Sequence, residues 1–325
     1  MTPGDAAGPT TGTGVVVIGG ANLDFKSQTT GPAISGTSNP GISRVSAGGV
    51  GRNVAENLGL LGVPTTLITA IGDDDGGARL VSATTSAGVN LEHAVRICGP
   101  SGSYTAILDA DGEMIIAVSA MGLMDAISAT TIDAGADVLR RAAILVMDCN
   151  VPEAALLRAA EIARECGARI VIDPVSVSKA ARVRSMLHAR VPIHTLTPNL
   201  DELCALTGCT DASEAELARA SERLHDDGVL HVWVRLGKRG SFFSARHDDN
   251  VTTRHLEPCP ARLVDATGAG DAMLAGYVAA LFSGFDESCA TNYGRAAAAM
   301  TVECGDTVNS AMTFAMLENR VEQCP

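Results

Sequence analysis

Short, continuously apolar segments recur along the chain, and each is followed by polar residues. The first is Val15-Val16-Val17-Ile18 and another lies at 143–147, while further short strands with polar residues among the apolar ones are predicted at 169–172 and 193–196. Such runs are typical of strands buried on both faces, and Ala- and Leu-rich segments typical of helices separate them. The polar ends lie at positions 22–24, 148–150, 173, 197–199 and 265. We therefore predict an α/β fold, with one doubly wound, mostly parallel central sheet flanked by helices and ligands bound at one edge.

A glycine-rich turn from Val264 to Asp271 precedes another apolar run, at 272–282. This order predicts a short strand, a turn and the start of a helix. The free N–H groups and the dipole of that helix would make an anion hole of residues 268–270. Asp271 falls in the first helical turn, where an ionised carboxylate could take a proton from an attacking hydroxyl. An ordinary helix cap after a glycine loop is the alternative.

Asn22 and Asp24 follow the first predicted strand. Residues two apart on an extended segment face the same way. An amide beside a carboxylate can hold the two hydroxyls of a vicinal diol, because each hydroxyl both donates and accepts. An Asx turn that closes the strand is an equally good interpretation.

Gly48 and Gly49 precede a helix that we expect over residues 53–61. The two glycines would allow the backbone to approach a small ligand. Asn53, at the expected helix start, could donate a hydrogen bond to that ligand. Arg52 could bind an anion, but we expect it to be exposed on the far face.

Asn199 and Glu202 are three residues apart on a helix predicted over 199–206, so they share a face. The pair could hold a water bound to Mg²⁺, or it could simply cap the helix. A second glycine turn, from Gly237 to Gly240, could cover nucleotide phosphates or could be an ordinary hairpin.

Residues 25–46 are polar and rich in Ser, Thr, Gly and Pro, which predicts an excursion from the main layer. An Asp-Gly turn at 111–112, between two apolar runs, predicts a β-hairpin. The segments from about 23–46 and 101–119 should together form a small β-strand lid. We expect residues 1–13 to be a disordered tail and 14–325 to be a single domain.

The amino-acid composition limits the partners that the chain can have. A net charge of −13 argues against nucleic acid, whose phosphates require a basic surface. We expect no membrane association, because no run reaches the ~18 apolar residues of a spanning helix. Nine scattered cysteines, with no CxxC or zinc-site spacing, predict free thiols in a reducing cytoplasm.

Three motifs resemble the signatures of a known family and occur in the same order. They are Gly48-Gly49-Val50-Gly51-Arg52-Asn53, Asn199-Leu200-Asp201-Glu202 and Asp265-Ala266-Thr267-Gly268-Ala269-Gly270-Asp271. Over nearly its full length, the chain resembles the ribokinase-like (PfkB) carbohydrate and nucleoside kinases. The resemblance implies an ATP-dependent phosphotransferase with an alcohol acceptor. It also implies Mg²⁺, a monovalent cation such as K⁺, and a homodimer formed through the lid.

The resemblance also implies roles for individual residues. Asp271 would be the catalytic base, with Gly268, Ala269 and Gly270 as the anion hole. The substrate ribose would be held by Asn22, Asp24, Gly48, Gly49, Asn53 and Asn150. The Mg–ATP side would involve Asn199, Glu202, Gly237, Gly240, Thr267, Gly268 and Gly270, with Glu202 reaching Mg²⁺ through water. Asp265 and Thr267 would belong to the monovalent-cation site.

Further segments resemble the branch of the family that phosphorylates pseudouridine, which makes the 5′-hydroxyl of a ribonucleoside the expected acceptor. They include Ser38-Asn39-Pro40-Gly41, Asp148-Cys149-Asn150 and Asp173-Pro174-Val175-Ser176. Two positions depart from the family pattern. Val50 replaces a Lys of some sugar kinases, and Arg235 stands where Ser or Thr is frequent. Another sugar or nucleoside kinase, acting on ribose, adenosine or inosine, or a catalytically silent nucleoside sensor, remains an alternative.

Overall fold

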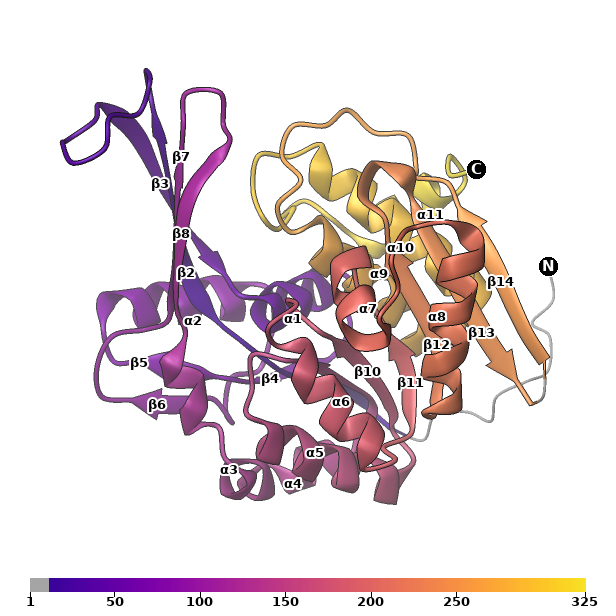
Figure 1. Cartoon of the computed structure of the whole chain (residues 1–325). Coiled ribbons are helices and arrows are strands. Elements are labelled where there is room, and N and C mark those ends of the chain that lie inside the picture. The colour runs from indigo at the N-terminus through magenta and orange to yellow at the C-terminus, as the bar shows by residue number, and fades with distance from the viewer. Residues whose placement is uncertain (1–11, 249) are drawn as a thin grey trace.

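The computed structural model describes residues 12–248 and 250–325, and most of the predicted tail 1–13 lies outside them. The main body contains an eight-stranded sheet (Figure 1). In spatial order its strands are β14 (Asn250–Leu256), β13 (Ser241–His247), β12 (Val229–Arg235), β11 (Ile193–Leu196), β10 (Arg169–Asp173), β9 (Ala142–Asp148), β1 (Gly14–Ile18) and β4 (Thr65–Ile68). The strands from β12 to β4 are parallel, whereas β13 and β14 pair antiparallel. The predicted α/β class with a mostly parallel central sheet is confirmed.

Helices cover both faces of this sheet. One apolar cluster joins Val16 and Ile18 to α3 (Ala129–Ala134), α4 (Ala136–Arg140), α5 (Glu153–Cys166), α6 (Ala180–His188), α7 (Leu200–Thr207) and α8 (Glu214–Asp226). The other joins Val15 and Val17 to α1 (Val50–Leu60), α9 (Ala269–Phe282), α10 (Glu287–Val302) and α11 (Phe314–Val321). Alternate residues of β1 therefore pack into opposite layers, as the period of a strand requires. Within the described ranges, no helix has the length and apolar character needed to cross a membrane.

A second, four-stranded sheet projects from the main body (Figure 1). Its strand order is β3 (Gly41–Gly48), β2 (Asn22–Thr29), β7 (Ser103–Leu108) and β8 (Met114–Ala120). The β7–β8 pair is the hairpin expected around the Asp-Gly turn. A smaller sheet of β5 (Ala70–Gly72) and β6 (Val95–Ile97) lies near α2 (Asp75–Ser86). The projecting sheet keeps large apolar side chains in solvent, and Ile42, Ile116 and Val118 are 57%, 58% and 59% exposed.

The carboxylate of Asp148 joins three segments where β9 ends. Its Oδ2 accepts the backbone N–H groups of Gly20 at 2.8 Å and Gly51 at 2.7 Å, and its Oδ1 accepts that of Asn150 at 2.8 Å. A Cβ at Gly51 would lie 2.6 Å from the Cα of Gly19, so the start of α1 needs glycine for this approach. Burial raises the pKa of Asp148, and the three N–H donors offset part of the cost of its charge.

Helix α1 begins at Val50, three residues before the predicted start. Its N-cap is Gly49, whose φ of 97° favours glycine, and a Cβ there would lie 2.4 Å from the carbonyl oxygen of Gly20. The early start also corrects the expectation that Arg52 is exposed. Its side chain turns inward, is 2% exposed and forms an ion pair with Glu56, one helical turn later, at 2.5 Å.

The prediction that all cysteines are free is wrong for four of them. Cys204 and Cys209 form a disulfide, because Gly208 ends α7 in the left-handed conformation and turns the chain back. Cys259 and Cys324 form another, although 65 residues separate them in the sequence. Only the folded chain brings the second pair together.

We predict that Gly51→Ala lowers the free energy of unfolding by about 1–3 kcal/mol, because the methyl group would overlap the backbone of Gly19. Gly122→Ala is the matched control, since no heavy atom lies within 4 Å of a Cβ there. It should change stability by no more than ~0.5 kcal/mol. Urea denaturation followed by circular dichroism measures both variants, and equal stability for the two would contradict the predicted overlap.

Candidate active site

Asp271 lies in the first turn of α9, directly after the glycine-rich turn. Gly268 caps this helix with a φ of 79°, and a Cβ there would lie 1.9 Å from the carbonyl oxygen of Thr307. Asp271 Oδ2 accepts a hydrogen bond of 2.7 Å from Asn53 Nδ2. The structure thus joins the start of α9 to α1, across 218 residues of sequence.

Burial raises the pKa of Asp271 to about 7, and the nearby carboxylates of Asp173 and Asp148 act in the same direction. The hydrogen bond from Asn53 and the charge of Arg235 oppose this rise. The sequence suggested an ionised carboxylate at this helix start, whereas with a pKa of about 7 Asp271 is only partly ionised near neutral pH. A pKa close to the working pH suits a general base.

Asn22 and Asp24 meet at the start of β2, where Asn22 Nδ2 donates to Asp24 Oδ1 at 2.6 Å. The two side chains therefore face the same way, as their spacing predicted. Gly48 on β3 makes room for them, since a Cβ at that position would lie 2.0 Å from Asp24 Oδ2. Burial raises the pKa of Asp24, and the hydrogen bond from Asn22 partly counteracts it.

Arg52 contacts the start of α1, and Asn150 lies close to Gly20. Arg52 donates to the carbonyl oxygen of Gly48 at 3.1 Å and to Asn53 Oδ1 at 2.8 Å, and so orients the amide that contacts Asp271. A Cβ at Gly20, which precedes β2, would lie 2.8 Å from the Asn150 amide nitrogen.

Lys179 is a polar residue of this edge that the sequence analysis missed. Its ammonium group donates to Asn150 Oδ1, and burial lowers the pKa of Lys179. It comes from the segment before α6, so no spacing in the sequence connects it with Asn150.

Arg235 links two carboxylates at this edge of the sheet, one at the end of β10 and one in α7. Its Nη1 lies 2.8 Å from Asp173 Oδ2, and its Nη2 lies 3.3 Å from Glu202 Oε2. Burial disfavours its charge, but the carboxylates of Asp173, Glu202 and Asp271 outweigh burial and raise the pKa of Arg235. A Cβ at Gly270 would lie 2.8 Å from Arg235 Nη1. The glycine therefore leaves space for a guanidinium at the N-terminus of α9.

Asn199 and Glu202 form the capping arrangement that was one of their two interpretations. The Asn199 side chain accepts from the Glu202 N–H at 2.9 Å, and Glu202 Oε2 accepts from the Asn199 N–H at 2.8 Å. Glu202 is 1% exposed, and burial raises its pKa. The Glu202 carboxylate is buried and its oxygens already have partners. It is therefore better suited to bind Mg²⁺ through a water molecule than to bind the ion directly.

Gly237 and Gly240, in the turn between β12 and β13, have different surroundings. Gly237 and Gly240 have φ of 60° and 77° at the two ends of the short helix η2 (Gly237–Arg239). A Cβ at Gly240 would lie 2.1 Å from the carbonyl oxygen of Leu256, so this glycine allows β14 to pack closely. A Cβ at Gly237 would meet no heavy atom within 4 Å, which leaves its backbone open to a ligand.

Asp265 and Thr267 are in contact with each other. Asp265 Oδ1 accepts the Thr267 N–H at 2.9 Å and its hydroxyl at 2.7 Å, and Lys26 Nζ of β2 lies 3.0 Å from Asp265 Oδ2. Burial alone would raise the pKa of Asp265, but these partners hold it below its usual value. One oxygen of the expected monovalent-cation site thus binds an ammonium group that comes from the projecting sheet.

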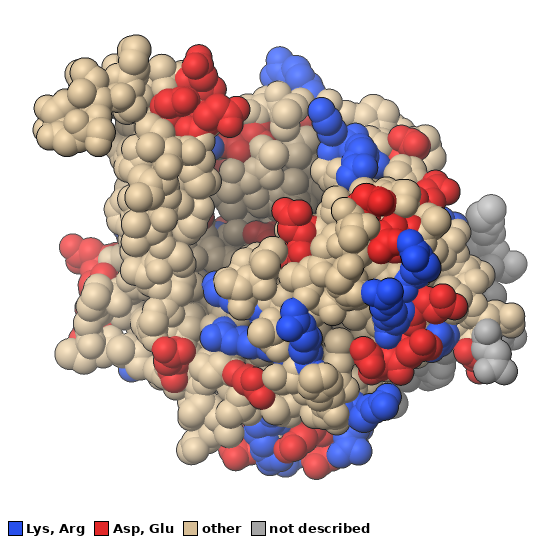
Figure 2. All heavy atoms as spheres, viewed as in Figure 1, with Lys and Arg blue, Asp and Glu red and all other residues tan. Residues whose placement is uncertain are grey.

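The site residues gather where the parallel strands end. The molecule is hollowed between the projecting sheet and the main body (Figure 2). Asn22, Asp24 and Gly48 lie at the base of that sheet, where β2 pairs with β3. A ligand in this hollow would be covered by the projecting sheet on one side.

Together, the doubly wound sheet and the carboxylate at the start of α9 are typical of phosphotransferases that act on small alcohols. The pfkB family of carbohydrate kinases matches residues 13–313, and the chain belongs to this family. The predicted family and enzyme class, an ATP-dependent kinase with an alcohol acceptor, are confirmed.

Individual relatives include kinases of different names. The chain is 31% identical to pseudouridine kinase of Escherichia coli (strain K12), over 95% of this chain and 96% of the relative. A solved carbohydrate kinase from Agrobacterium tumefaciens is 30% identical, with a TM-score of 0.79, over 96% and 97% of the two chains. The ribokinase of Arabidopsis thaliana, solved with ribose and ATP, is 23% identical with a TM-score of 0.83 over 96% and 99%, and shows the shared fold.

We predict that Asn53→Ala raises the pKa of Asp271 above the value of about 7, because the lost hydrogen bond stabilises the charged carboxylate. Carbon-13 NMR of labelled aspartate carboxyl groups measures the titration, and Asp271→Asn identifies its signal. Asn319→Ala, at an exposed position of α11, is the control and should leave this pKa unchanged. A lower pKa in Asn53→Ala would show that the amide does not stabilise the ionised form.

Proposed function

We propose that this kinase transfers the γ-phosphoryl group of ATP to the 5′-hydroxyl of a ribonucleoside, and that its acceptor is pseudouridine. The observation that carries the proposal is the 2.7 Å hydrogen bond between Asn53 and Asp271. It places the Asn53 amide, which can hold a sugar hydroxyl, directly beside the Asp271 carboxylate, which can take the proton of that hydroxyl. Similarity to the E. coli pseudouridine kinase supports the choice of acceptor. Similarity to the Agrobacterium carbohydrate kinase makes a sugar the alternative.

The ribose would bind against β2 and α1. The amide of Asn22 and the carboxylate of Asp24 offer a donor and an acceptor to the 2′- and 3′-hydroxyls. Gly49 would bring its backbone close to the sugar, and Asn53 would complete the set of donors. Asn150, oriented by Lys179, would approach from the opposite side.

Asp271 would act as the general base. As the 5′-oxygen bonds to the γ-phosphorus and the bond to the ADP oxygen breaks, the hydroxyl proton would pass to the Asp271 carboxylate. The raised pKa, about 7, makes this group a stronger base than an ordinary aspartate. The backbone N–H groups of Gly268, Ala269 and Gly270 would stabilise the negative charge of the transferred group.

Arg235 would assist that anion hole. Its Nη1 lies beside Gly270 and is held by Asp173, so the remaining N–H of this nitrogen would donate to a phosphate oxygen. Without this cation, the carboxylates of Asp173 and Glu202 would repel an approaching phosphate.

The nucleotide would bind on the side of α7 and η2, against Asn199, Gly237, Gly240 and Thr267. Glu202 would orient a water of the Mg²⁺ ion, which when bound with ATP supplies charge neutralisation. Asp265 and Thr267 would hold a monovalent cation once Lys26 leaves the carboxylate.

The projecting sheet would serve as a lid over the sugar. Its exposed Ile42, Ile116 and Val118 suit a second copy of this chain, which would make the protein a homodimer. We further propose that the kinase works in the cytoplasm on free nucleosides rather than on nucleic acid or at a membrane.

ADP release with Mg–ATP should be at least ~100-fold faster, as kcat/KM, with pseudouridine than with uridine, adenosine, inosine or ribose. A coupled assay at matched concentrations measures all five acceptors, and mass spectrometry of the product locates the phosphate. Preference for another acceptor would support the kinase activity but contradict pseudouridine as the acceptor. Nucleoside binding without ADP release would favour a silent sensor.

Asp271→Asn is the control for this assay. It should bind nucleoside normally and lose about 10²–10³ or more in kcat, as expected when a preorganised catalytic group is removed. Turnover like that of the wild type would contradict the role of Asp271.

Arg235→Thr should lower kcat/KM for Mg–ATP by about 10²-fold, because a cation beside the transferred phosphoryl group is lost. Arg235→Lys should recover part of this loss, since it keeps the charge but not the bidentate geometry. Arg246→Thr removes an arginine from the surface ion pair with Asp226 and should leave the rate unchanged. Equal rates for Arg235→Thr and the wild type would show that Arg235 acts only in holding Asp173 and Glu202.

A further inference from the structure

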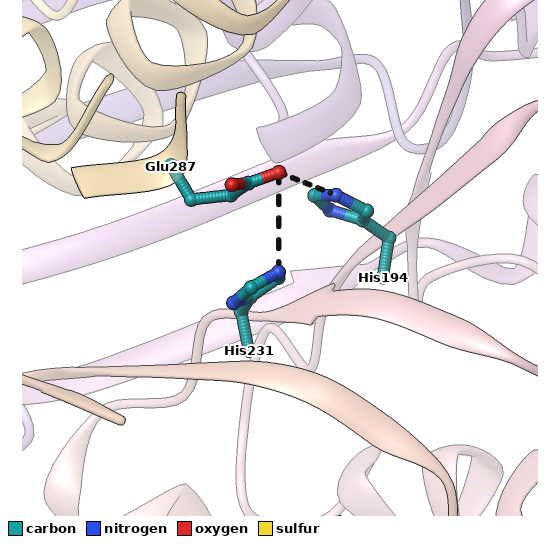
Figure 3. A group of neighbouring side chains, drawn as sticks. All are labelled: His194, His231 and Glu287. Carbon is teal, nitrogen blue, oxygen red and sulfur yellow. Dashed lines mark hydrogen bonds and ion pairs between the residues drawn. The ribbon is translucent and has the colours of Figure 1, made fainter. Parts of the chain in front are cut away.

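Two histidines and a glutamate meet on the side of the sheet covered by α10 (Figure 3). His194 lies on β11, His231 on β12, and Glu287 is the first residue of α10. Glu287 Oε1 lies 3.1 Å from His194 Nε2 and 3.9 Å from His231 Nε2. One nitrogen or oxygen from each of the three residues lies within 4.8 Å of the others.

His231 has no conventional partner for its imidazole. It is 4% exposed, and within the described residues its Nδ1 accepts or donates no hydrogen bond. Its Nε2 points at Glu287 across a distance too long for a hydrogen bond. An imidazole with a buried, unpartnered Nδ1 and an Nε2 beyond hydrogen-bonding range is poorly satisfied, which is costly. The Nε2, which faces Glu287, is the nitrogen open to a ligand.

The surroundings of His194 are those of a metal-binding histidine. Its Nδ1 lies 2.8 Å from Thr195 Oγ1, which lies 3.0 Å from the Tyr277 hydroxyl. Each hydroxyl can donate or accept, so the chain can reverse and let Nδ1 carry the proton. Nε2, which pairs with Glu287 Oε1 at 3.1 Å, would then bind a cation in place of that hydrogen bond, with Thr195 orienting the ring from behind.

The three side chains also affect one another's pKa values. Burial and the adjacent His194 lower the pKa of His231. Burial opposes the charge of Glu287, but the two histidines outweigh it and lower the pKa of this carboxyl group. The next imidazole is that of His247 on β13, whose ring centre lies 5.9 Å from that of His231.

We propose that His194, His231 and Glu287 bind a divalent transition metal ion, with Zn²⁺ as the best match. Two imidazole nitrogens and one carboxylate oxygen favour zinc over Mg²⁺, which prefers oxygen ligands alone. Tetrahedral ligands about 2.0–2.1 Å from zinc lie roughly 3.3 Å from one another, so the present spacings need only small side-chain movements. The fourth position is left to water.

This metal site is separate from the phosphoryl-transfer site and does not depend on the proposed function. Arg235 lies four residues further along β12, or about 13 Å at ~3.3 Å per residue. The metal would tie the first halves of β11 and β12 to α10, the helix that packs against α9. Its role would be to stabilise the layer that carries Asp271.

Calorimetric titration of the chelator-treated full chain with Zn²⁺ tests the proposal. We expect one ion per chain, an affinity at least ~100-fold weaker in His231→Gln and Glu287→Gln, and about tenfold weaker in Thr195→Val. Zn²⁺ should also raise the melting temperature of the wild type and not that of Glu287→Gln, a variant that removes the most exposed of the three ligands.

His255→Gln is the matched control, because His255 and Glu257 form a surface pair 3.8 Å apart with no third ligand among the residues that the structure describes. It should bind Zn²⁺ as the wild type does. Co²⁺ in place of Zn²⁺ should give the visible absorption of a four-coordinate ion without thiolate charge transfer. No stoichiometric binding, unchanged binding in Glu287→Gln, or thiolate charge transfer from the free cysteines would each overturn the proposal.

Discussion

The buried carboxylate of Asp148 is the contact on which the ligand edge of this kinase depends. It accepts the N–H groups of Gly20 and Gly51, so the end of β1 and the start of α1 are held against the end of β9. The polar pair that opens β2 follows Gly20 closely, and Asn53 comes two residues after Gly51. The orientation of Asn53 toward Asp271 therefore rests on a hydrogen-bonded junction outside this pair of side chains.

Several carboxylates gather at the same edge of the sheet, and the balance between them and Arg235 affects the pKa of Asp271. Asp148, Asp173 and Glu202 surround the start of α9, with Arg235 as the cation between them. Burial and the neighbouring carboxylates raise the pKa of Asp271, while Arg235 limits the rise. The same carboxylates that raise the pKa of Asp271 would repel a phosphate, so the proposed phosphoryl transfer needs the guanidinium at this point.

Local patterns in the sequence predicted the features that depend on neighbours in the chain. The apolar runs and the residues between them indicated the sheet and its helices, and the spacing of Asn22 and Asp24 indicated that they face the same way. Features that depend on distant partners were missed or wrong. Arg52 is buried because α1 begins early at a glycine, which gives no side-chain capping signal. Lys179 reaches Asn150 only because α6 follows β10 beside β9.

The sequence by itself determined the fold class, the family and the residue types available for phosphoryl transfer, because periodicity and motif spacing are local properties. The tertiary structure alone decided how those residues are used. It buried Asp271 enough to move its pKa to about 7, placed Arg235 beside Gly270, and joined His194 and His231 to Glu287. Burial and electrostatic coupling are properties of the packed chain, since they depend on which distant groups replace water around each charge.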